Sequence, residues 1–400
     1  MAGVPLTPYR RVLAVPGVRS LTLLGIAARI PHAATAVILT VHVVTTLGRG
    51  YGAAGFVVAA WTVGMALGAP WRGRAVDRLG LRTALIPSLV AEGAVWCTAP
   101  WLPFPALVAT VVVGGALGLP TFTVVRLALS LMVPQAQRRT AFALDSVSVE
   151  VSFMVGPALG VLLATHASTA LALVALGVSM VLAGVGLMAL NPPTRSAERT
   201  AQDAADRHDG RARPKVGIPV TPALLAVLAA AAGATVVLAG TDVSIIASLR
   251  STGELGWTGL VAAVWAFASL LGGVVYGLVP RSLPPFWLLF GLGALTVPVG
   301  LAHGPLALSL AMLPAGFLCA PVITATAEVL TALVPEAVRG EAMGWHGSAL
   351  TVGTAVGAPL AGFAIDRGAA SVGFATVGAL GALLAAAGLA VVALRRRALA

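Results

Sequence analysis

The chain has 400 residues, of which 58% are hydrophobic and only 10% are charged, and its mean hydropathy is +0.96. Soluble globular proteins carry about 25% charged residues, so this chain has too few charges to cover a water-facing surface. The composition excludes a cytosolic enzyme, a secreted disulfide scaffold and a disordered protein, and it predicts a polytopic membrane protein.

The formal net charge is +11, from 25 Lys and Arg against 14 Asp and Glu. Such a charge can indicate nucleic-acid binding, but here the basic residues lie in short segments between apolar runs, where they set membrane topology. We therefore expect no nucleic-acid partner. Cys97 and Cys319 lie inside apolar runs and indicate neither a disulfide framework nor a metal site, and we expect no cofactor.

Twelve apolar runs are each near the ~20 residues that a helix needs to cross a bilayer. They are apolar all round rather than alternating, which predicts helices and not a barrel. The expected fold class is an all-α integral membrane protein with spans at 18–46, 52–71, 82–101, 104–132, 140–165, 168–190, 218–248, 257–280, 284–302, 305–333, 341–365 and 370–394.

The first run follows Arg10 and Arg11 and so resembles a signal peptide. It is too long for the apolar region of a signal peptide and contains Arg29 and Pro31, so we interpret it as an uncleaved first span.

The distribution of basic residues predicts the orientation. With the N-terminus inside, the inner segments hold 20 of the 25 basic residues, and the outer loops hold only Arg49, Arg250 and Arg367. The positive-inside rule then places both termini in the cytoplasm of a multi-pass protein of the cell inner membrane.

Residues 191–217 form the one long polar stretch. They cannot bury enough apolar surface to order themselves, so we expect a flexible cytoplasmic linker. It would separate an N-terminal six-helix bundle, 1–190, from a C-terminal one, 218–400.

The two halves repeat. Residues 133–141 read VPQAQRRTA and residues 334–342 read VPEAVRGEA, and at the same offset Pro120 matches Pro321. Parallel repeats of this kind predict two pseudo-symmetric halves, which is a transporter architecture.

Gly-x-x-x-Gly pairs occur in spans 2, 4, 5, 8 and 11. Small residues at this spacing allow close helix approach in lipid. We infer that spans 2, 5, 8 and 11 pack across the interface between the halves; the alternative is that 46 glycines produce such pairs by chance.

The loop after span 2 contains Gly73, Asp77, Arg78, Gly80 and Arg82. Asp77 between arginines can form a charge network, and its carboxylate can cap a helix N-terminus of the other half.

This block resembles the loop 2–3 signature of the major facilitator superfamily, although Leu81 replaces a usual basic residue. The second-half counterpart keeps Gly277 but has Arg281 where the aspartate would align. With twelve spans and a half-to-half repeat, the resemblance covers the whole chain and implies alternating access.

Two further motifs resemble those of proton-coupled exporters. Gly156, Pro157 and Gly160 in span 5 are similar to the core of the antiporter motif, which implies that this helix helps to seal the interface and favours exchange. Arg126 resembles the membrane-embedded arginine of proton-coupled drug exporters, but the Gln-Gly pair that follows it there is missing.

Charges inside a span are costly and mark transport pathways. Arg29 and Arg126 each need an anionic partner, for which Asp145 and Glu150 are the candidates. Glu150, in mid-span, is the favoured proton carrier, with static ion pairs as the alternative, whereas Asp145 is expected near the hydrated cytoplasmic end. The candidate coupling and cavity residues are Glu150, Arg126, Arg29, His32, Asp145, Asp242, Glu328 and His346.

Other polar groups in the spans have ordinary interpretations. Glu92 is expected to be a satisfied core group, and His42 is expected at the membrane interface.

The missing motifs narrow the energy source. The single lysine, Lys215, follows Pro214, so there is no phosphate-binding Gly-Lys-Ser/Thr sequence. An ion gradient, most simply protons, then drives transport.

We therefore expect a secondary transporter, not an enzyme, that exports a drug-like or amphipathic metabolite by proton-coupled alternating access. An importer or a lipid-type translocator is the alternative, and a membrane receptor or embedded enzyme is the rival class. The Ala-, Gly- and Arg-rich composition suggests a bacterial source, and we expect a monomer.

Overall fold

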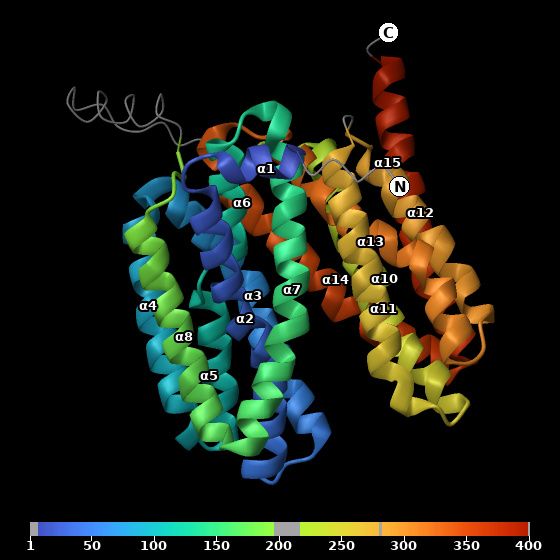
Figure 1. Ribbon diagram of the computed structural model, residues 1–400, viewed down its shortest axis with the longest axis horizontal. Coiled ribbons are helices and arrows are strands. Elements are labelled where there is room, and N and C mark those ends of the chain that lie inside the picture. Colours follow the sequence, from blue (N-terminus) through green and yellow to red (C-terminus); the bar gives the residue numbers. More distant parts are fainter. Residues whose placement is uncertain (1–6, 196–216, 280–281, 399–400) are drawn as a thin grey trace.

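The computed structural model describes residues 7–195, 217–279 and 282–398. Their regular structure is helical, and long helices run side by side through the molecule (Figure 1). Residues 196–216 of the expected linker, and Arg281, lie outside the described residues.

The first half is built on eight helices, of which the first is short. They are α1 (Thr7–Ala14), α2 (Val18–Val41), α3 (Tyr51–Leu79), α4 (Leu81–Thr98), α5 (Phe104–Leu117), α6 (Thr121–Met132), α7 (Arg138–His166) and α8 (Thr169–Leu190).

The second half follows the same plan without the short first helix and with one unbroken helix, α13, in place of α5 and α6. Its helices are α10 (Pro222–Ser251), α11 (Thr258–Leu278), α12 (Pro285–Thr296), α13 (Pro305–Leu333), α14 (Arg339–Asp366) and α15 (Ala370–Ala398).

Each of the twelve predicted spans corresponds to helical structure. Ten of the described segments are long and apolar enough to cross a membrane. The other two are α4, of 18 residues, and Pro285–Leu301, in which a 3₁₀ turn extends α12. The structure is therefore an all-helical membrane protein, as the composition predicts.

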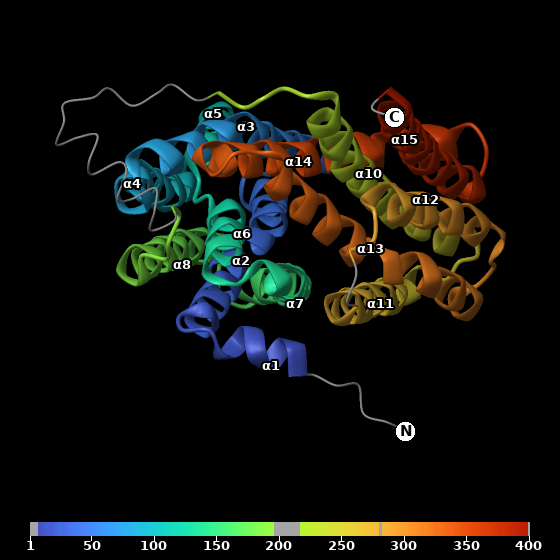
Figure 2. The ribbon, with the colours of Figure 1, turned by 90° about the horizontal axis from the view of Figure 1, so that it is seen from above.

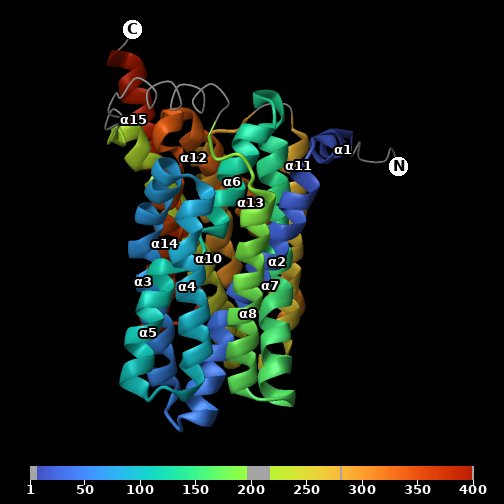
Figure 3. The same cartoon turned by 90° about the vertical axis from the view of Figure 1, so that its left-hand side faces the viewer.

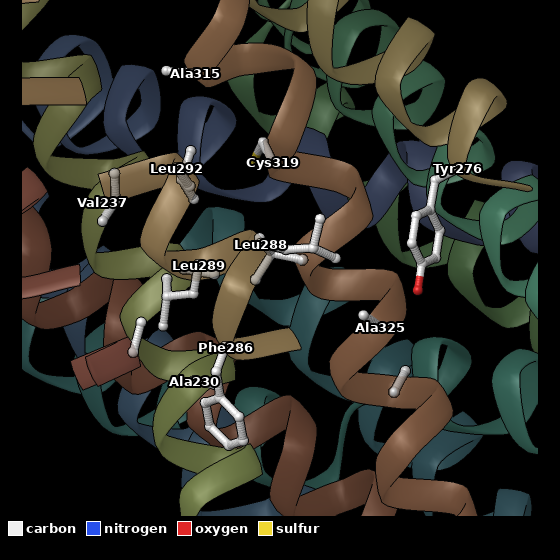
Figure 4. Close-up of a cluster of buried hydrophobic side chains, with 14 of the residues drawn as sticks. Ala230, Val237, Tyr276, Phe286, Leu288, Leu289, Leu292, Ala315, Cys319 and Ala325 are labelled. Atoms are coloured by element: carbon white, nitrogen blue, oxygen red, sulfur yellow. The ribbon is translucent and has the colours of Figure 1, made fainter. Parts of the chain in front are cut away.

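The two halves form separate bundles that meet along a central interface (Figure 2). In the second half, apolar side chains of α10, α11, α12 and α13 converge on a core that includes Val237, Leu289 and Cys319 (Figure 4). Figures 1 and 3 show α1 and the C-terminus of α15 at the same end of the molecule. We call this the basic end, because Arg74, Arg78 and Arg139 also lie there.

The predicted continuous span 104–132 is broken between α5 and α6, at Gly118–Pro120. Buried side chains of neighbouring helices satisfy the freed backbone groups. Arg72 Nη1 donates to the carbonyl oxygens of Gly115 and Gly118, at 2.9 and 2.7 Å, and Glu92 Oε1 accepts the Leu119 N–H at 3.0 Å. An irregular backbone is tolerated at membrane depth only when its polar groups are paired in this way.

The predictions for two polar residues, Glu92 and His42, have different outcomes. Glu92 is a satisfied core group, as expected, since it also accepts the indole N–H of Trp96. His42 is fully buried within the protein, with its Nδ1 3.0 Å from the Thr169 hydroxyl, and its position at the membrane interface stays a prediction.

The Gly-x-x-x-Gly prediction identifies the helices that pack across the interface. Most of the glycines themselves, however, face helices of their own half. The pairs α3–α14 and α7–α11 do pack across the halves. Gly64 and Gly68, however, face α5, and Gly353 and Gly357 face α10 of their own half.

The glycines of the span 5 motif also pack within their own half. Gly156 and Gly160 pack against Ile30, Ala34 and Ile38 of α2, so these glycines tighten the first half, and the role of the motif in sealing the interface stays a prediction.

Candidate functional site

The first contact region between the halves joins α3 to α14. The carboxylate of Asp77 accepts the backbone N–H groups of Gly340, at 3.0 Å, and Glu341, at 2.8 Å, in the first turn of α14. This is the helix cap across the halves that the sequence predicts. The guanidinium of Arg74 pairs with the Glu341 carboxylate. We call this region the charged seam.

Glycines allow the charged seam to close. A side chain at Gly73 would collide with the backbone of Gly340, and one at Gly344 would collide with Ala69 and Pro70. The backbones of α3 and α14 are therefore close enough for the side chains of Asp77 and Ser348 to reach the backbone of the other helix.

The remaining loop 2–3 residues work within the first half. Gly80 has a φ of +80° and lets α4 begin directly after α3. Arg82 donates to the Met188 carbonyl oxygen at 3.1 Å, which ties α4 to the end of α8, and Arg78 is exposed.

The second contact region joins α7 to α11 and α13. The Thr140 hydroxyl donates to the Gly277 carbonyl oxygen at 2.6 Å, and the Ser146 and Thr324 hydroxyls lie 2.7 Å apart. Arg139 lies 3.5 Å from Glu328. Because most of these bonds use hydroxyl groups and carbonyl oxygens, we call this region the neutral seam.

Both seams lie toward the basic end. On α3 the contacts run from Ala66, whose carbonyl oxygen accepts the Ser348 hydroxyl at 2.6 Å, to Asp77. On α7 they run from Arg139 to Glu150. The halves are therefore joined at the basic end.

A buried ion triad lies inside the first half. Asp145 accepts Arg29 Nη2 at 2.6 Å and Arg126 Nε at 2.8 Å, and the side chains of Arg29 and Asp145 are 1% and 0% exposed. The structure thus selects Asp145 as the partner of both arginines. The expectation that Asp145 lies in a hydrated position is wrong, because α2 and α6 cover it.

Aromatic rings line the same region. The His32 ring lies 5.1 Å from Trp61 and 5.3 Å from Phe122, and the guanidinium of Arg29 lies 4.9 Å from the Phe122 ring centre. Phe122 follows directly on the break between α5 and α6, so the break positions both Phe122 and Arg126.

Glu150 lies in the middle of α7 and contacts the other half. Ser269 of α11 donates its hydroxyl to Glu150 Oε1 at 2.8 Å. Asp242 of α10 is exposed and lies close enough to Glu150 for the two acids to interact electrostatically, as does buried Cys319. Glu150 is thus partnered by a hydroxyl and lies within electrostatic range of another acid.

The last two candidates lie apart from this pair. His346 is buried on α14, with its Nε2 3.0 Å from the Thr326 hydroxyl, and it is within electrostatic range of Arg126. Glu328 is at the basic end, where Ser282 donates to it at 3.1 Å.

Sequence reasoning missed Ser269 and Arg72. Hydroxyl groups are frequent in membrane helices, so Ser269 carries no signal until α11 is placed beside α7. Arg72 is one of the 20 inner basic residues that were interpreted as topology signals. The sequence did not mark its buried role, because the break at Gly118–Pro120 that it stabilises was not predicted. Within the described residues, no three His, Cys, Asp or Glu side chains gather as they would around a metal ion.

Comparison with solved structures supports the fold. The chain is similar to the human organic anion transporter MFSD10 (TETRAN), with 18% identity, a TM-score of 0.70, and 92% of this chain and 99% of that chain covered. It is also similar to a bacterial homologue of the iron transporter ferroportin in its outward-facing state, with 15% identity, a TM-score of 0.71, and coverage of 93% and 97%.

A third similar structure is the E. coli fucose:proton symporter FucP, with 12% identity, a TM-score of 0.66, and coverage of 94% and 98%. Among curated protein sequences there is no match.

A search of protein families gives a direct assignment. Residues 21–313 match the Major Facilitator Superfamily, which is well over half of the chain and includes α3, α7 and α11. The chain therefore belongs to the major facilitator superfamily, and it is a secondary transporter and not an enzyme.

Proposed function

We propose that this transporter couples proton movement to the export of an amphipathic small molecule by alternating access. The observation that carries the proposal is Glu150: a carboxylate in mid-span, bonded across the halves to Ser269 and facing Asp242. It acts in a bacterial cytoplasmic membrane, with the basic end in the cytoplasm and 1–190 and 218–400 as the two moving bundles.

The two acids favour binding of a positive charge. Glu150 and Asp242 repel each other in an apolar setting, whereas Asp145 has two arginine partners. A proton, or a cationic group of a substrate, relieves this repulsion. Proton and substrate then compete for one site, which is the requirement for exchange.

The bond to Ser269 links protonation to conformation. A hydrogen bond to a carboxylate is roughly twice as strong as one to a neutral acceptor. Protonation of Glu150 therefore weakens a bond that holds α7 against α11, and the halves separate more readily.

The direction of transport rests on the resemblance of Arg126 to the arginine of drug exporters. Import is the alternative, and FucP and the xylose transporter XylE are similar structures described as proton symporters. A lipid-type translocator is a further alternative, and we propose a monomer as the active form.

The test is transport in proteoliposomes, with a fluorescent amphipathic cation such as ethidium as the probe. We expect Glu150→Gln to lose accumulation driven by a pH gradient and to retain gradient-free counterflow. Asp366→Asn, which removes an exposed acid at the opposite end of α14, is the control and should keep both activities.

Two results would contradict the assignment. If Glu150→Gln retains pH-driven accumulation while Asp242→Asn abolishes it, the coupling site lies in the second half. If the wild-type protein shows no proton-linked movement of any amphipathic cation, the proposed substrate class is wrong.

A further inference from the structure

The short helix α1 lies at the basic end, crosswise to the long helices and at the outer edge of the bundle beside α7 (Figures 1 and 2). It is amphipathic. Tyr9 and Val12 are buried, whereas Arg10 and Arg11 are exposed. Because the long helices span a bilayer, a helix lying crosswise at their ends is at the level of the lipid headgroups.

The buried face of α1 bridges the two halves. The hydroxyl of Tyr9 donates to the carbonyl oxygen of Val274 at 2.8 Å and to that of Gly273 at 3.3 Å, both on α11. Burial raises the pKa of this hydroxyl, so it stays protonated as a donor. Since α1 is continuous with α2 of the first half, α1 works as a strap over the neutral seam.

The junction of α1 and α2 carries a third exposed arginine beside a pocket. The pocket has a volume of about 420 Å³ and is lined by residues 13–17 with Arg19 and Ser20. The Nε–H of Arg19 donates to the Leu13 carbonyl oxygen at 2.9 Å, which holds the guanidinium at the pocket.

An exposed apolar side chain lies one turn further along α2 from the pocket. Leu23 lies four residues after Arg19, on the same face of α2, and it is 68% exposed. A cationic group at the headgroup level with an exposed leucine one turn deeper matches a phosphate group with an acyl chain below it.

We propose that the cationic face of α1 and the α1–α2 junction bind an anionic phospholipid of the bilayer, through Arg10, Arg11 and Arg19. Guanidinium groups bind phosphate oxygens in a bidentate manner, and anionic lipids attract basic residues at the membrane surface. The bound lipid holds α1 against the membrane, and so holds Tyr9 against α11, which favours the state joined at the basic end.

The binding test uses the full-length protein in detergent and native mass spectrometry. Phosphatidylglycerol is titrated against phosphatidylcholine, with inorganic phosphate as a competitor to separate lipid binding from simple anion binding. An arginine near the surface contributes about fivefold in affinity. We therefore expect the triple variant R10Q/R11Q/R19Q to weaken phosphatidylglycerol binding by at least about tenfold.

A matched triple variant, R49Q/R250Q/R367Q, removes three exposed arginines from the opposite end and should bind phosphatidylglycerol as the wild type does. Equal binding by wild type and the α1 triple variant, an equal loss in the control, or full displacement by millimolar phosphate would each overturn the lipid site.

The conformational test uses nanodiscs and spin labels at Gln135 and Ala332, which are exposed and lie at the basic end of the two halves. Cys97 and Cys319 are first replaced. In wild type, phosphatidylglycerol should shift the population toward the shorter distance, and Tyr9→Phe should abolish this shift while lipid binding stays intact. A Tyr9→Phe variant that responds to lipid like the wild type would overturn the strap.

Discussion

The charged seam and the neutral seam occupy equivalent places in the two halves, yet they close by different chemistry. In the charged seam a carboxylate, Asp77, binds two backbone N–H groups at the start of α14. In the neutral seam Thr140 donates to the Gly277 carbonyl oxygen at the end of α11. One seam caps a helix N-terminus and the other a helix C-terminus.

This difference shows how a repeat can keep its geometry while its chemistry changes. The helix N-terminus offers unpaired N–H groups and a partial positive charge, which suit a carboxylate, and the C-terminus offers carbonyl oxygens, which suit a hydroxyl or guanidinium donor. The Arg139 guanidinium, which also donates to the Val279 carbonyl oxygen, fits the same rule. We expect the charged seam to contribute more to holding the basic end closed.

The largest effect should come from forcing the charged seam apart. Gly344→Leu places a side chain against the backbone of Ala69 and Pro70, at a cost of about 3 kcal/mol to the closed state. The open population, measured with the spin labels at Gln135 and Ala332, should rise more than a hundredfold relative to the closed one. Gly347→Leu is the control, since nothing lies within 4 Å of a side chain there.

Asp77→Asn should have the next largest effect. It keeps the shape but offers one acceptor oxygen where the carboxylate offers two, so one of the two hydrogen bonds to α14 is lost, which costs about 1.5 kcal/mol. The ratio of open to closed molecules should rise about tenfold, and transport should fall while substrate binding is kept. Unchanged transport would mean that Asp77 serves only as part of the membrane-topology signal.

Thr140→Val tests the neutral seam with a side chain of the same shape. It removes one hydroxyl donor to the Gly277 carbonyl oxygen, which costs about 1 kcal/mol. The same spin-label ratio should rise about fivefold, which is less than for Asp77→Asn. A larger effect for Thr140→Val would reverse the order of the two seams.

Arg74→Gln should have the smallest effect, although it breaks an ion pair with Glu341. The Arg74 side chain is 47% exposed, and exposed ion pairs contribute about 0.5 kcal/mol. We expect a change of about twofold that disappears in high salt, because salt screens exposed charges. An effect that persists in high salt would show that the pair is shielded from solvent.

The sequence predicted features that depend on local pattern or on repetition. The twelve apolar runs gave the helices, because a chain in lipid must satisfy its backbone within each span. The match of VPQAQRRTA to VPEAVRGEA predicted the equivalence of α7 and α14, and the position of Asp77 predicted its cap on the other half.

The sequence could not predict which side chains meet across helices. Arg29 and Arg126 had two candidate acids, and only the packing of α2 and α6 around α7 decided for Asp145. In the same way, the sequence did not indicate which helix Gly156 and Gly160 pack against, and the structure places them against α2.

The break between α5 and α6 shows this division most clearly. Pro120 and Pro321 occupy matching places in the repeat, yet α13 runs unbroken through Pro321 while the first-half span is interrupted at Gly118–Pro120. Sequence alone determined that a proline stands at each place. The tertiary structure decided that only the first becomes a break, because Arg72 and Glu92 from α3 and α4 supply the hydrogen bonds that the interrupted backbone needs within the membrane.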